Sequence, residues 1–395
     1  MALFLHTADW QIGRIYSQFD SGDAVELTNA RIDGIKRIAA LAAEHQVDAV
    51  LVAGDVFDTQ TPRDKTIVRM FEAMAGYAGP WVLLPGNHDA ALPESVWEVA
   101  RRLNAVPANV TLCLAPEARS VTGLSGQAFT VLPAPLTQRH THTDLTQWFD
   151  GAESPSGHLR IGLAHGSVAG ILAEHVDSPN PIAQDRAARA RLDYLALGDW
   201  HGRKQIDERT WYSGTHEPER FRDNDPGWAL LVEIDAPGAV PTVTPIQVGR
   251  YRWSQLVLEI RSPVDADAAE AALAAIDGDT VADVTLTGTC DMATRERLTD
   301  ALAGAQRRAA AMTASLHALE LAPTDGDLQA LRADGFVGET LQELKSQLLG
   351  PQPEVTRDAL MILARLLRQS GAGGSASGAS PASAEPASAV SKEAA

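Results

Sequence analysis

The stretch Ala53–Asp58 has the sequence AGDVFD and directly follows the apolar run Ala49–Val52. Four consecutive apolar residues ahead of a glycine predict a fully buried β-strand. In open α/β sheets ligands bind beyond the carboxyl ends of the strands, so a carboxylate at this point faces a crevice. Gly54 permits the sharp turn that Asp55 needs to face inward. Strand, glycine and aspartate also occur together for structural reasons, so the rest of the chain decides whether Asp55 is functional.

Strands and helices alternate on both sides of this stretch. The pattern predicts strands at 3–5, 48–53 and 81–84, with amphipathic helices at 25–45 and 64–77 between them. This alternation indicates right-handed βαβ units and a mainly parallel sheet. Further strands are predicted at 110–113, 119–122, 129–132, 159–164 and 194–197, with a helix-like run at 186–191. Later strands at 210–213, 228–234 and 242–248 have the alternation of an antiparallel layer.

The pattern changes after about residue 250. Strands at 255–260 and 281–286 and helices at 265–276 and 294–303 predict a small α+β domain. From Ser370 onward Gly, Ala, Ser and Pro dominate, and such a segment buries too little apolar surface to become ordered. We therefore expect a main domain over 1–250, a small domain over 254–350, a helix over 354–369 and a disordered tail over 370–395.

Composition is typical of a globular protein. The chain has 395 residues, of which 45% are hydrophobic and 21% are charged. Its net charge of −18 argues against a protein that coats nucleic acid non-specifically. No apolar run approaches the roughly 20 residues that a membrane span needs, and no secretory signal is visible. Cys113 and Cys290 are isolated in the sequence, which fits a reducing compartment, so we expect a cytoplasmic protein.

Five predicted strands end in side chains that bind metals. These side chains are Asp9 with Gln11, Asp55 with Asp58, Asn87 with His88, His165, and Asp199 with His201. Parallel neighbouring strands bring such ends to one edge of a sheet. Mixed Asp, Asn and His ligands suit Mn²⁺, Fe²⁺ or Zn²⁺, and two such ions about 3.5–4 Å apart polarise a phosphoryl oxygen and activate water. His88 then serves as general acid or as electrostatic support for the leaving oxygen.

In this order the motifs resemble those of the calcineurin-like metallophosphoesterases. They are Asp9, GDVFD at 54–58, GNHD at 86–89, His165 and GDWH at 198–201. Within that family the chain is most similar to the SbcD-type DNA repair exonucleases. HTADW at 6–10, GDVFDT at 54–59 and WYSGT at 211–215 carry this closer resemblance, which covers 1–235 well and 250–350 in outline.

The resemblance implies a fold and a role for each motif. The fold is a four-layer α/β metallophosphoesterase sandwich with a small α+β capping domain and a disordered C-terminal tail. Asp55 bridges two metal ions. One ion is held by Asp55 with Asp9, Gln11 and His201, and the other by Asp55 with Asn87, His165 and Asp199. His88 is the catalytic histidine, and Asp58 or Asp89 orients it.

Two positions depart from the family pattern. Gln11 and Asp199 stand where the family has histidines, so each ion loses one imidazole. Glutamine is the poorer ligand, and aspartate adds a charge and a harder donor. These changes favour oxygen-binding ions such as Mn²⁺ and weaken the first ion position. Occupancy by two ions or by one ion therefore both stay open.

Basic residues follow the last two motifs. Arg186, Arg189, Arg203 and Lys204 are candidates for contacts with DNA phosphates, and a solvated charged face is an equal alternative. The resemblance also implies partners, namely DNA, an SbcC-like coiled-coil ATPase and a second copy of the chain.

The function expected from these observations is metal-dependent phosphodiester hydrolysis, as a DNA repair exonuclease that works with the ATPase. Two alternatives stay open. The first is a phosphodiesterase for small phosphate esters, and the second is a metal-poor subunit that scaffolds the ATPase. The sequence does not distinguish exonuclease from endonuclease, nor does it give the polarity of digestion.

Overall fold

The computed structural model describes residues 1–170, 179–322, 335–347, 350–351, 355–360, 362–363 and 366. The predicted tail 370–395 and part of the predicted helix 354–369 lie outside these residues. Contacts divide the chain into two compact units. One unit holds Met1–Val257, Leu273–Thr285 and Ala303–Ser315, and the other holds Leu258–Ala272, Leu286–Leu302 and Leu316–Ala395. The domain ranges 1–250 and 254–350 stay a prediction.

The first sheet of the larger unit has six strands in the order β14-β13-β1-β2-β3-β4. They are β1 (Ala2–Thr7), β2 (Ala49–Ala53), β3 (Trp81–Leu84), β4 (Val110–Leu112), β13 (Trp228–Ile234) and β14 (Thr242–Gln247). β1 to β4 are parallel to one another, as the alternation of strands and helices predicts. β13 pairs antiparallel with β1, and β14 pairs antiparallel with β13.

The second sheet has the order β11-β12-β10-β7-β6-β5. Its strands are β5 (Arg119–Thr122), β6 (Ala128–Ala134), β7 (Leu159–His165), β10 (Tyr194–Gly198), β11 (Lys204–Gln205) and β12 (Thr210–Tyr212). The four central strands are parallel, and the edge strands β5 and β11 run antiparallel.

Apolar side chains from both sheets meet between them. Phe4 of β1 and Phe129 of β6 are fully buried, with ring centroids 4.9 Å apart. Leu51 and Tyr194 belong to the same buried cluster. Each such side chain contributes about 1.5–3 kcal/mol by leaving water, so the two sheets form a stable sandwich.

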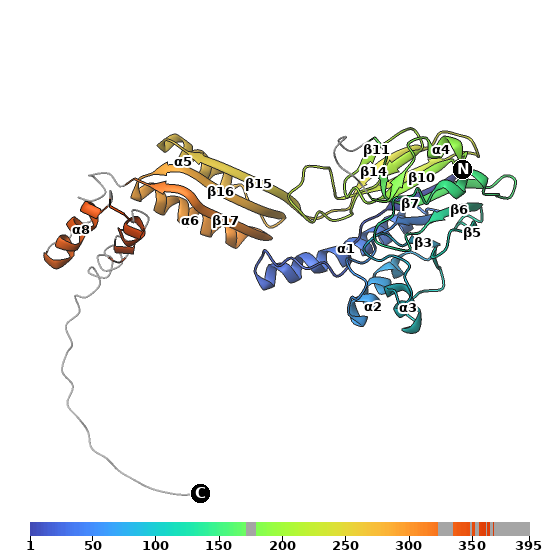
Figure 1. Ribbon diagram of the computed structural model, residues 1–395, viewed down its shortest axis with the longest axis horizontal. Coiled ribbons are helices and arrows are strands. Elements are labelled where there is room, and N and C mark those ends of the chain that lie inside the picture. The colour runs from blue at the N-terminus through green and yellow to red at the C-terminus, as the bar shows by residue number, and fades with distance from the viewer. Residues whose placement is uncertain are drawn as a thin grey trace, which may run out of the picture. The chain divides into compact units, whose positions relative to one another are not determined.

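Helices cover the outer faces of this sandwich (Figure 1). α1 (Ser21–Glu44), α2 (Asp64–Ala73) and α3 (Val96–Arg102) pack on the first sheet, where Ile35, Met70 and Trp97 share a cluster with Val50. On the second sheet Ala187 of α4 (Arg186–Arg189) packs with Leu132. The order helix, sheet, sheet, helix confirms the four-layer α/β architecture.

One prediction about the sheets is wrong. The strands predicted at 210–213, 228–234 and 242–248 do not form an antiparallel layer of their own. β12 pairs parallel with β10 in the second sheet, while β13 and β14 extend the first sheet. Their alternating pattern reflects strands at or next to a sheet edge with one partly exposed side, which sequence periodicity does not distinguish from a separate layer. α3 and β17 (Ala311–Leu321) were not predicted.

The chain after residue 250 also mixes strands and helices. β15 (Arg252–Ile260), β16 (Thr280–Cys290) and β17 form a three-stranded sheet. The helices with assigned bounds in the described part of this region are α5 (Pro263–Ala274), α6 (Met292–Arg308) and α8 (Gly335–Gln347), and residues 355–360 are also helical. The remaining short elements are η1 (Met74–Gly76), η2 (Gln147–Gly151), β8 (Ser167–Val168) and β9 (Pro181–Ile182). Among the described residues, no helix combines the length and apolar character that crossing a bilayer requires.

Candidate metal centre

The predicted metal ligands lie together at the carboxyl ends of five strands. β1, β2 and β3 of the first sheet supply Asp9, Asp55 and Asn87, and β7 and β10 of the second sheet supply His165 and Asp199. The sequence predicted a single sheet edge, whereas the ends come from two facing sheets. Hydrogen bonds join them, because the backbone N–H of Asp199 donates to Oδ1 of Asp9 at 3.0 Å.

The backbone is in the left-handed region at most of these positions. The φ angles are 53° at Asp9, 42° at Gln11, 52° at Asp55, 102° at Asp199 and 61° at His201. Each such non-glycine residue costs about 1–3 kcal/mol, and such residues cluster at functional sites. Loop hydrogen bonds hold this conformation, with the N–H of Asp9 donating to the oxygen of Gly54 at 3.0 Å.

Two glycines allow the ligands to approach one another. Gly54 has φ 89°, and a Cβ there would lie 2.3 Å from Nδ1 of His165. A Cβ on Gly86 would lie 2.1 Å from Oδ1 of Asp55. Both distances are far below van der Waals contact, so any larger residue at either position displaces a predicted ligand.

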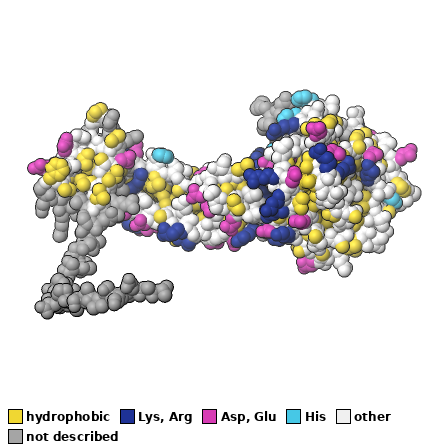
Figure 2. Space-filling model, turned by 90° about the horizontal axis from the view of Figure 1, so that it is seen from below, with side chains coloured by type: hydrophobic (Ala, Val, Ile, Leu, Met, Phe, Trp, Pro, Cys, Tyr) yellow, Lys and Arg dark blue, Asp and Glu magenta, His cyan; other side chains and the backbone are white. Residues whose placement is uncertain are grey.

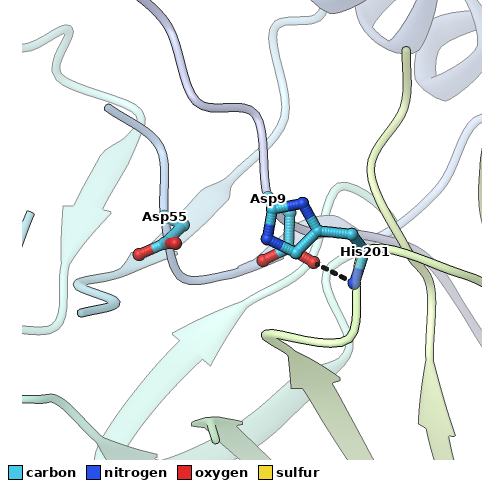
Figure 3. A group of neighbouring side chains, drawn as sticks. All are labelled: Asp9, Asp55 and His201. Atoms are coloured by element: carbon cyan, nitrogen blue, oxygen red, sulfur yellow. Dashed lines mark hydrogen bonds between the residues drawn. The ribbon is translucent and has the colours of Figure 1, made fainter. Parts of the chain in front are cut away.

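Asp9, Asp55 and His201 are neighbours, and Figure 3 shows the side chains of Asp9 and His201 close together with Asp55 to one side. Each is buried, and one ligand atom from each lies within 4.8 Å of the others. Burial raises the pKa of Asp9, and the nearby His201 and His165 only partly offset this. Two buried carboxylates beside an imidazole fit a divalent cation, which would compensate their charge. We call Asp9, Gln11, Asp55 and His201 the Gln11 position.

A second group surrounds the other side of Asp55. Nε2 of His165 lies 2.9 Å from Oδ1 of Asn87, 3.5 Å from Oδ1 of Asp55 and 3.8 Å from Oδ1 of Asp199. We call Asp55, Asn87, His165 and Asp199 the Asn87 position. These oxygen and nitrogen donors also fit a divalent ion.

His165 takes part in charge balance when no ion is bound. Its Nδ1 donates to the carbonyl oxygen of Ala53 at 2.9 Å, which directs Nε2 into the Asn87 position. Burial lowers the pKa of His165, but Asp55, Asp9 and Asp199 outweigh it and raise the pKa to about 9. Three carboxylates therefore surround the ring of His165, an arrangement that favours positive charge at this point.

Gln11 does not point its oxygen at the other ligands. Its Oε1 accepts a hydrogen bond from Nη1 of Arg14 at 2.9 Å. Its Nε2 instead faces the site, 3.5 Å from Oδ2 of Asp55 and 3.4 Å from Nε2 of His201. The Gln11 side chain thus directs N–H donors, and no ligand atom, toward Asp55 and His201.

His88 lies beside Asp55, and its backbone N–H donates to Oδ1 of Asp55 at 2.9 Å. Its Nδ1 donates to the backbone oxygen of Asp58 at 2.8 Å. The Asp58 carboxylate pairs with Arg14 at 3.3 Å. Asp89 accepts from the N–H of Gly86 at 2.6 Å, and burial, followed by repulsion from Asp55, raises the pKa of Asp89 to about 7. A main-chain oxygen, and neither carboxylate, therefore holds the His88 ring.

Sequence reasoning missed Glu219, which follows β12. Its buried Oε1 lies 2.6 Å from Nδ1 of His201. Burial opposes ionisation, but His201, Arg31 and Arg14 hold the pKa of Glu219 well below its usual range. A carboxylate accepts only, so the Nδ1 proton of His201 faces Glu219 and Nε2 faces the site. No motif marks Glu219, because the contact joins residues from two separate loops.

Arg31 on α1 was also missed. It is fully buried and donates to the backbone oxygens of Asp9, Trp10 and Glu217 at 3.0, 2.7 and 2.9 Å. Arg31 thereby ties the first motif to the loop that carries Glu219. A signal exists in the sequence, because Arg31 falls at helical spacing within the apolar side of α1, between Leu27 and Ile35.

The four basic candidates differ in their surroundings. Arg186 is buried and pairs with Asp144 at 2.7 Å and Asp150 at 2.5 Å. Arg189 also pairs with Asp150, at 2.9 Å. Arg203 pairs with Asp225 at 2.6 Å and lies over the Trp228 ring. Nζ of Lys204 lies 4.5 Å from the centre of the Trp200 ring. Trp200 lies in the sequence between Asp199 and His201, which are both predicted ligands.

Comparison with known proteins identifies relatives. Residues 2–203 match the family described as calcineurin-like phosphoesterase. The chain is 24% identical to the SbcD subunit of the SbcCD nuclease of Bacillus subtilis over 293 residues, which cover 66% of this chain and 70% of that protein. It is 42% identical to the protein of the same name from Rhodobacter capsulatus over 101 residues, 23% of this chain and 24% of that protein.

The chain is also similar to an archaeal protein. It is 28% identical to "DNA double-strand break repair protein Mre11" of Aeropyrum pernix over 280 residues, which cover 66% of this chain and 64% of that protein. The matches to the Rhodobacter and Aeropyrum proteins thus span less than two thirds of those proteins' own length.

Proposed function

Because the chain belongs to the calcineurin-like phosphoesterase family, we propose that it is a DNA repair exonuclease that hydrolyses phosphodiester bonds with divalent metal ions. The observation that carries this proposal is the convergence of carboxylates and imidazoles on Asp55. Asp9, Asp55 and His201 bring three ligand atoms within 4.8 Å of one another, all buried. The relatives named as nucleases support a nucleic acid as the substrate, and the relative named as a DNA double-strand break repair protein supports DNA.

We assign two ions, preferably Mn²⁺, to the Gln11 and Asn87 positions. Asp55 is the ligand that the two positions share. When bound, such ions polarise the phosphoryl group and activate water for attack. The mixture of hard carboxylates with imidazoles supports Mn²⁺.

His88 acts on the leaving oxygen. Its Nδ1 proton stays with the oxygen of Asp58, 2.8 Å away, so Nε2 is the atom that exchanges a proton with substrate. In its protonated form the ring donates that proton to the departing sugar oxygen. The hydrogen bond between its backbone and Asp55 keeps the ring beside the bridging ligand.

Lys204 and Arg203 are the candidates for DNA phosphate contacts that lie next to the site in sequence. Arg222 adds a third cation, with its guanidinium carbon 5.3 Å from the centre of the Trp200 ring. Arg186 is held by Asp144 and Asp150, so we assign it to the structure of that loop. Figure 2 shows Lys and Arg side chains on the visible surface with Asp and Glu between them, which supports local contacts over a broad basic coat.

A partner protein belongs to this proposal. The bacterial relatives carry the name of one subunit of the SbcCD nuclease, which marks them as parts of a larger nuclease. We propose that this chain works with a coiled-coil ATPase and forms a homodimer. In the described part of the predicted helix 354–369, the apolar side chains Val355 and Ile362 are exposed, which supports a docking role for that helix. Cys113 and Cys290 are buried thiols, which supports a cytoplasmic location.

The test is metal rescue on two substrates. Protein stripped with a chelator receives Mn²⁺ and is assayed on linear DNA and on bis(p-nitrophenyl) phosphate, with product analysis for end polarity. We expect Mn²⁺-dependent release of nucleotides from DNA ends. Turnover of the small diester without DNA cleavage would overturn the assignment of the substrate. Absence of bound Mn²⁺ and of both activities would instead identify a scaffold protein.

A further inference from the structure

Gln11 is fixed in an orientation that works against metal binding. Arginine only donates hydrogen bonds, so the 2.9 Å contact from Nη1 of Arg14 identifies the atom it meets as Oε1 of Gln11. The NH₂ group must then face Asp55 and His201. An amide nitrogen donates hydrogen bonds and offers no lone pair to a metal, so Gln11 contributes no ligand in this orientation.

Arg14 is itself anchored. Its Nη1 lies 3.3 Å from Oδ1 of Asp58, and its Nε lies 3.3 Å from Oε2 of Glu219. If the Gln11 amide rotated so that its oxygen faced the site, its NH₂ group would face the N–H donors of Arg14. The Arg14 network therefore resists that rotation. It also places a guanidinium charge beside the Gln11 position.

We propose that the two ion positions fill unequally, with the Asn87 position filling first, because Arg14 holds Gln11 as a donor toward the Gln11 position. The Gln11 position keeps three ligand residues, Asp9, Asp55 and His201. The Asn87 position brings four, Asp55, Asn87, His165 and Asp199, so the two positions have equal numbers of carboxylates but differ by one ligand residue. The inference rests on the proposed function only in taking this site to hold divalent ions.

His201 does not share the deficit of Gln11. Its Nδ1 lies 2.6 Å from Glu219, which leaves Nε2 available as a ligand. The weakness of the Gln11 position is therefore located at one side chain. Replacement of that side chain by an isosteric acceptor is expected to restore a fourth ligand.

The test measures bound Mn²⁺ and its magnetic coupling, with no use of activity. Wild-type protein is dialysed against increasing free Mn²⁺, and each sample is analysed for metal content and by electron paramagnetic resonance. We expect one ion per chain with an uncoupled signal at low Mn²⁺. The second ion and a spin-coupled signal should need at least about tenfold more free Mn²⁺.

Gln11→Glu replaces the NH₂ group by an oxygen with little change in shape. We expect the second ion to bind about 10–100-fold more tightly, with the coupled signal appearing alongside the first ion. Gln46→Glu is the matched control, because this substitution adds the same charge at an exposed residue just beyond α1. Thermal unfolding reports whether the variants fold. Gln11→His is the second variant, and it is expected to tighten the second ion as well.

Two further variants identify the position that fills first. His201→Ala should retain the tight ion and lose the weak one, whereas Asp199→Ala should lose the tight ion. Two ions entering wild type together with a coupled signal would overturn the inference. So would unchanged binding in folded Gln11→Glu and Gln11→His. Protein that fills unequally but cleaves no DNA would overturn the proposed function alone, and protein that binds no Mn²⁺ would overturn both.

Discussion

The Gln11 position and the Asn87 position share Asp55, yet different groups stand behind their ligands. In the Asn87 position the Nδ1 of His165 is held by a backbone oxygen, that of Ala53. In the Gln11 position the Nδ1 of His201 faces a buried carboxylate, that of Glu219, which in turn pairs with Arg14. The first arrangement is fixed by strand geometry. The second depends on side chains from several loops, so single substitutions should change it more readily.

This difference shows why ligand identity alone does not describe a metal site. Both positions follow the same local plan, with a strand end, a left-handed residue and a buried donor. The two positions differ in the groups that contact their predicted ligands, because Arg14 holds the oxygen of Gln11 away from the site. Partners behind the ligands orient them and set their basicity, and loss of such a partner typically costs about 10–100-fold in metal affinity.

The largest expected effect is at the shared ligand. Asp55→Asn should weaken both positions together, and DNA cleavage should fall by more than about a thousandfold, because several kcal/mol of charge stabilisation by the ions is lost. Metal content and DNA cleavage are measured in parallel. Asp64→Asn is the control, because Asp64 is exposed at the start of α2 and its replacement is expected to leave both ions bound. Two tightly bound ions in Asp55→Asn would show that the positions do not share this residue.

The second effect concerns the loops that hold the Gln11 position. Arg31→Met removes donors from the backbone oxygens of Asp9, Trp10 and Glu217. Leaving buried acceptors without partners should cost about 3–5 kcal/mol in the free energy of unfolding, measured by denaturant titration. Arg69→Met on the exposed side of α2 should change it by less than about 0.5 kcal/mol. Equal stability of the two variants would show that Arg31 does not tie these loops together.

The third prediction concerns stability in acid and involves His6, which is not one of the predicted metal ligands. His6 is buried on β1, with Nδ1 2.9 Å from the Tyr194 hydroxyl, and burial lowers its pKa to about 3. The unfolded state protonates His6 near pH 6.5, whereas the folded state does so only near pH 3. Acid therefore favours the unfolded state, so the free energy of unfolding is at its full value above about pH 6.5 and decreases as the pH falls.

The expected loss from His6 is about 3 kcal/mol at about pH 4. His6→Gln keeps a polar group for Tyr194 but does not titrate, so its unfolding free energy should decrease less with acid. Chelator-treated protein serves for both variants, which removes any contribution from bound ions. Parallel pH profiles for wild type and His6→Gln would contradict this assignment.

The smallest predicted effect tests the contrast itself. Glu219→Gln should weaken ion binding at the Gln11 position by about 10–100-fold, because an amide no longer fixes the Nδ1 proton of His201. The Asn87 position should keep its affinity, since the partner of His165 is a backbone oxygen. The control in the metal titration is Gln205→Glu, which replaces an amide by a carboxylate at an exposed residue. Equal weakening of both positions would show that they are not independent.

Much of the fold follows from the sequence because it rests on local patterns. Apolar runs and helical spacing predicted the strands that carry Asp9, Asp55, Asn87, His165 and Asp199, and the structure brings these residues together. The division of the strands between two facing sheets was not predicted, because a buried strand has the same pattern in either sheet. β13 and β14 illustrate this, since they extend the first sheet rather than form a layer of their own.

The site was harder to predict where contacts join distant loops. Glu219 lies 18 positions after His201, and no spacing rule links a carboxylate to an imidazole across such a loop. The orientation of Gln11 depends on Arg14 and hence on the fold around both residues. Arg31 left a signal, a charge within an apolar helix face, but the signal alone does not identify its partners.

The measurement that tests the central claim most directly is DNA cleavage by His88→Ala at matched Mn²⁺ occupancy. His88 donates through Nδ1 to Asp58 and leaves Nε2 for the substrate, so it should affect proton transfer without removing an ion. We expect metal content equal to that of wild type and a cleavage rate lower by about 10²–10³-fold. A wild-type rate in the fully loaded variant would contradict the assignment of this site as the one that hydrolyses DNA.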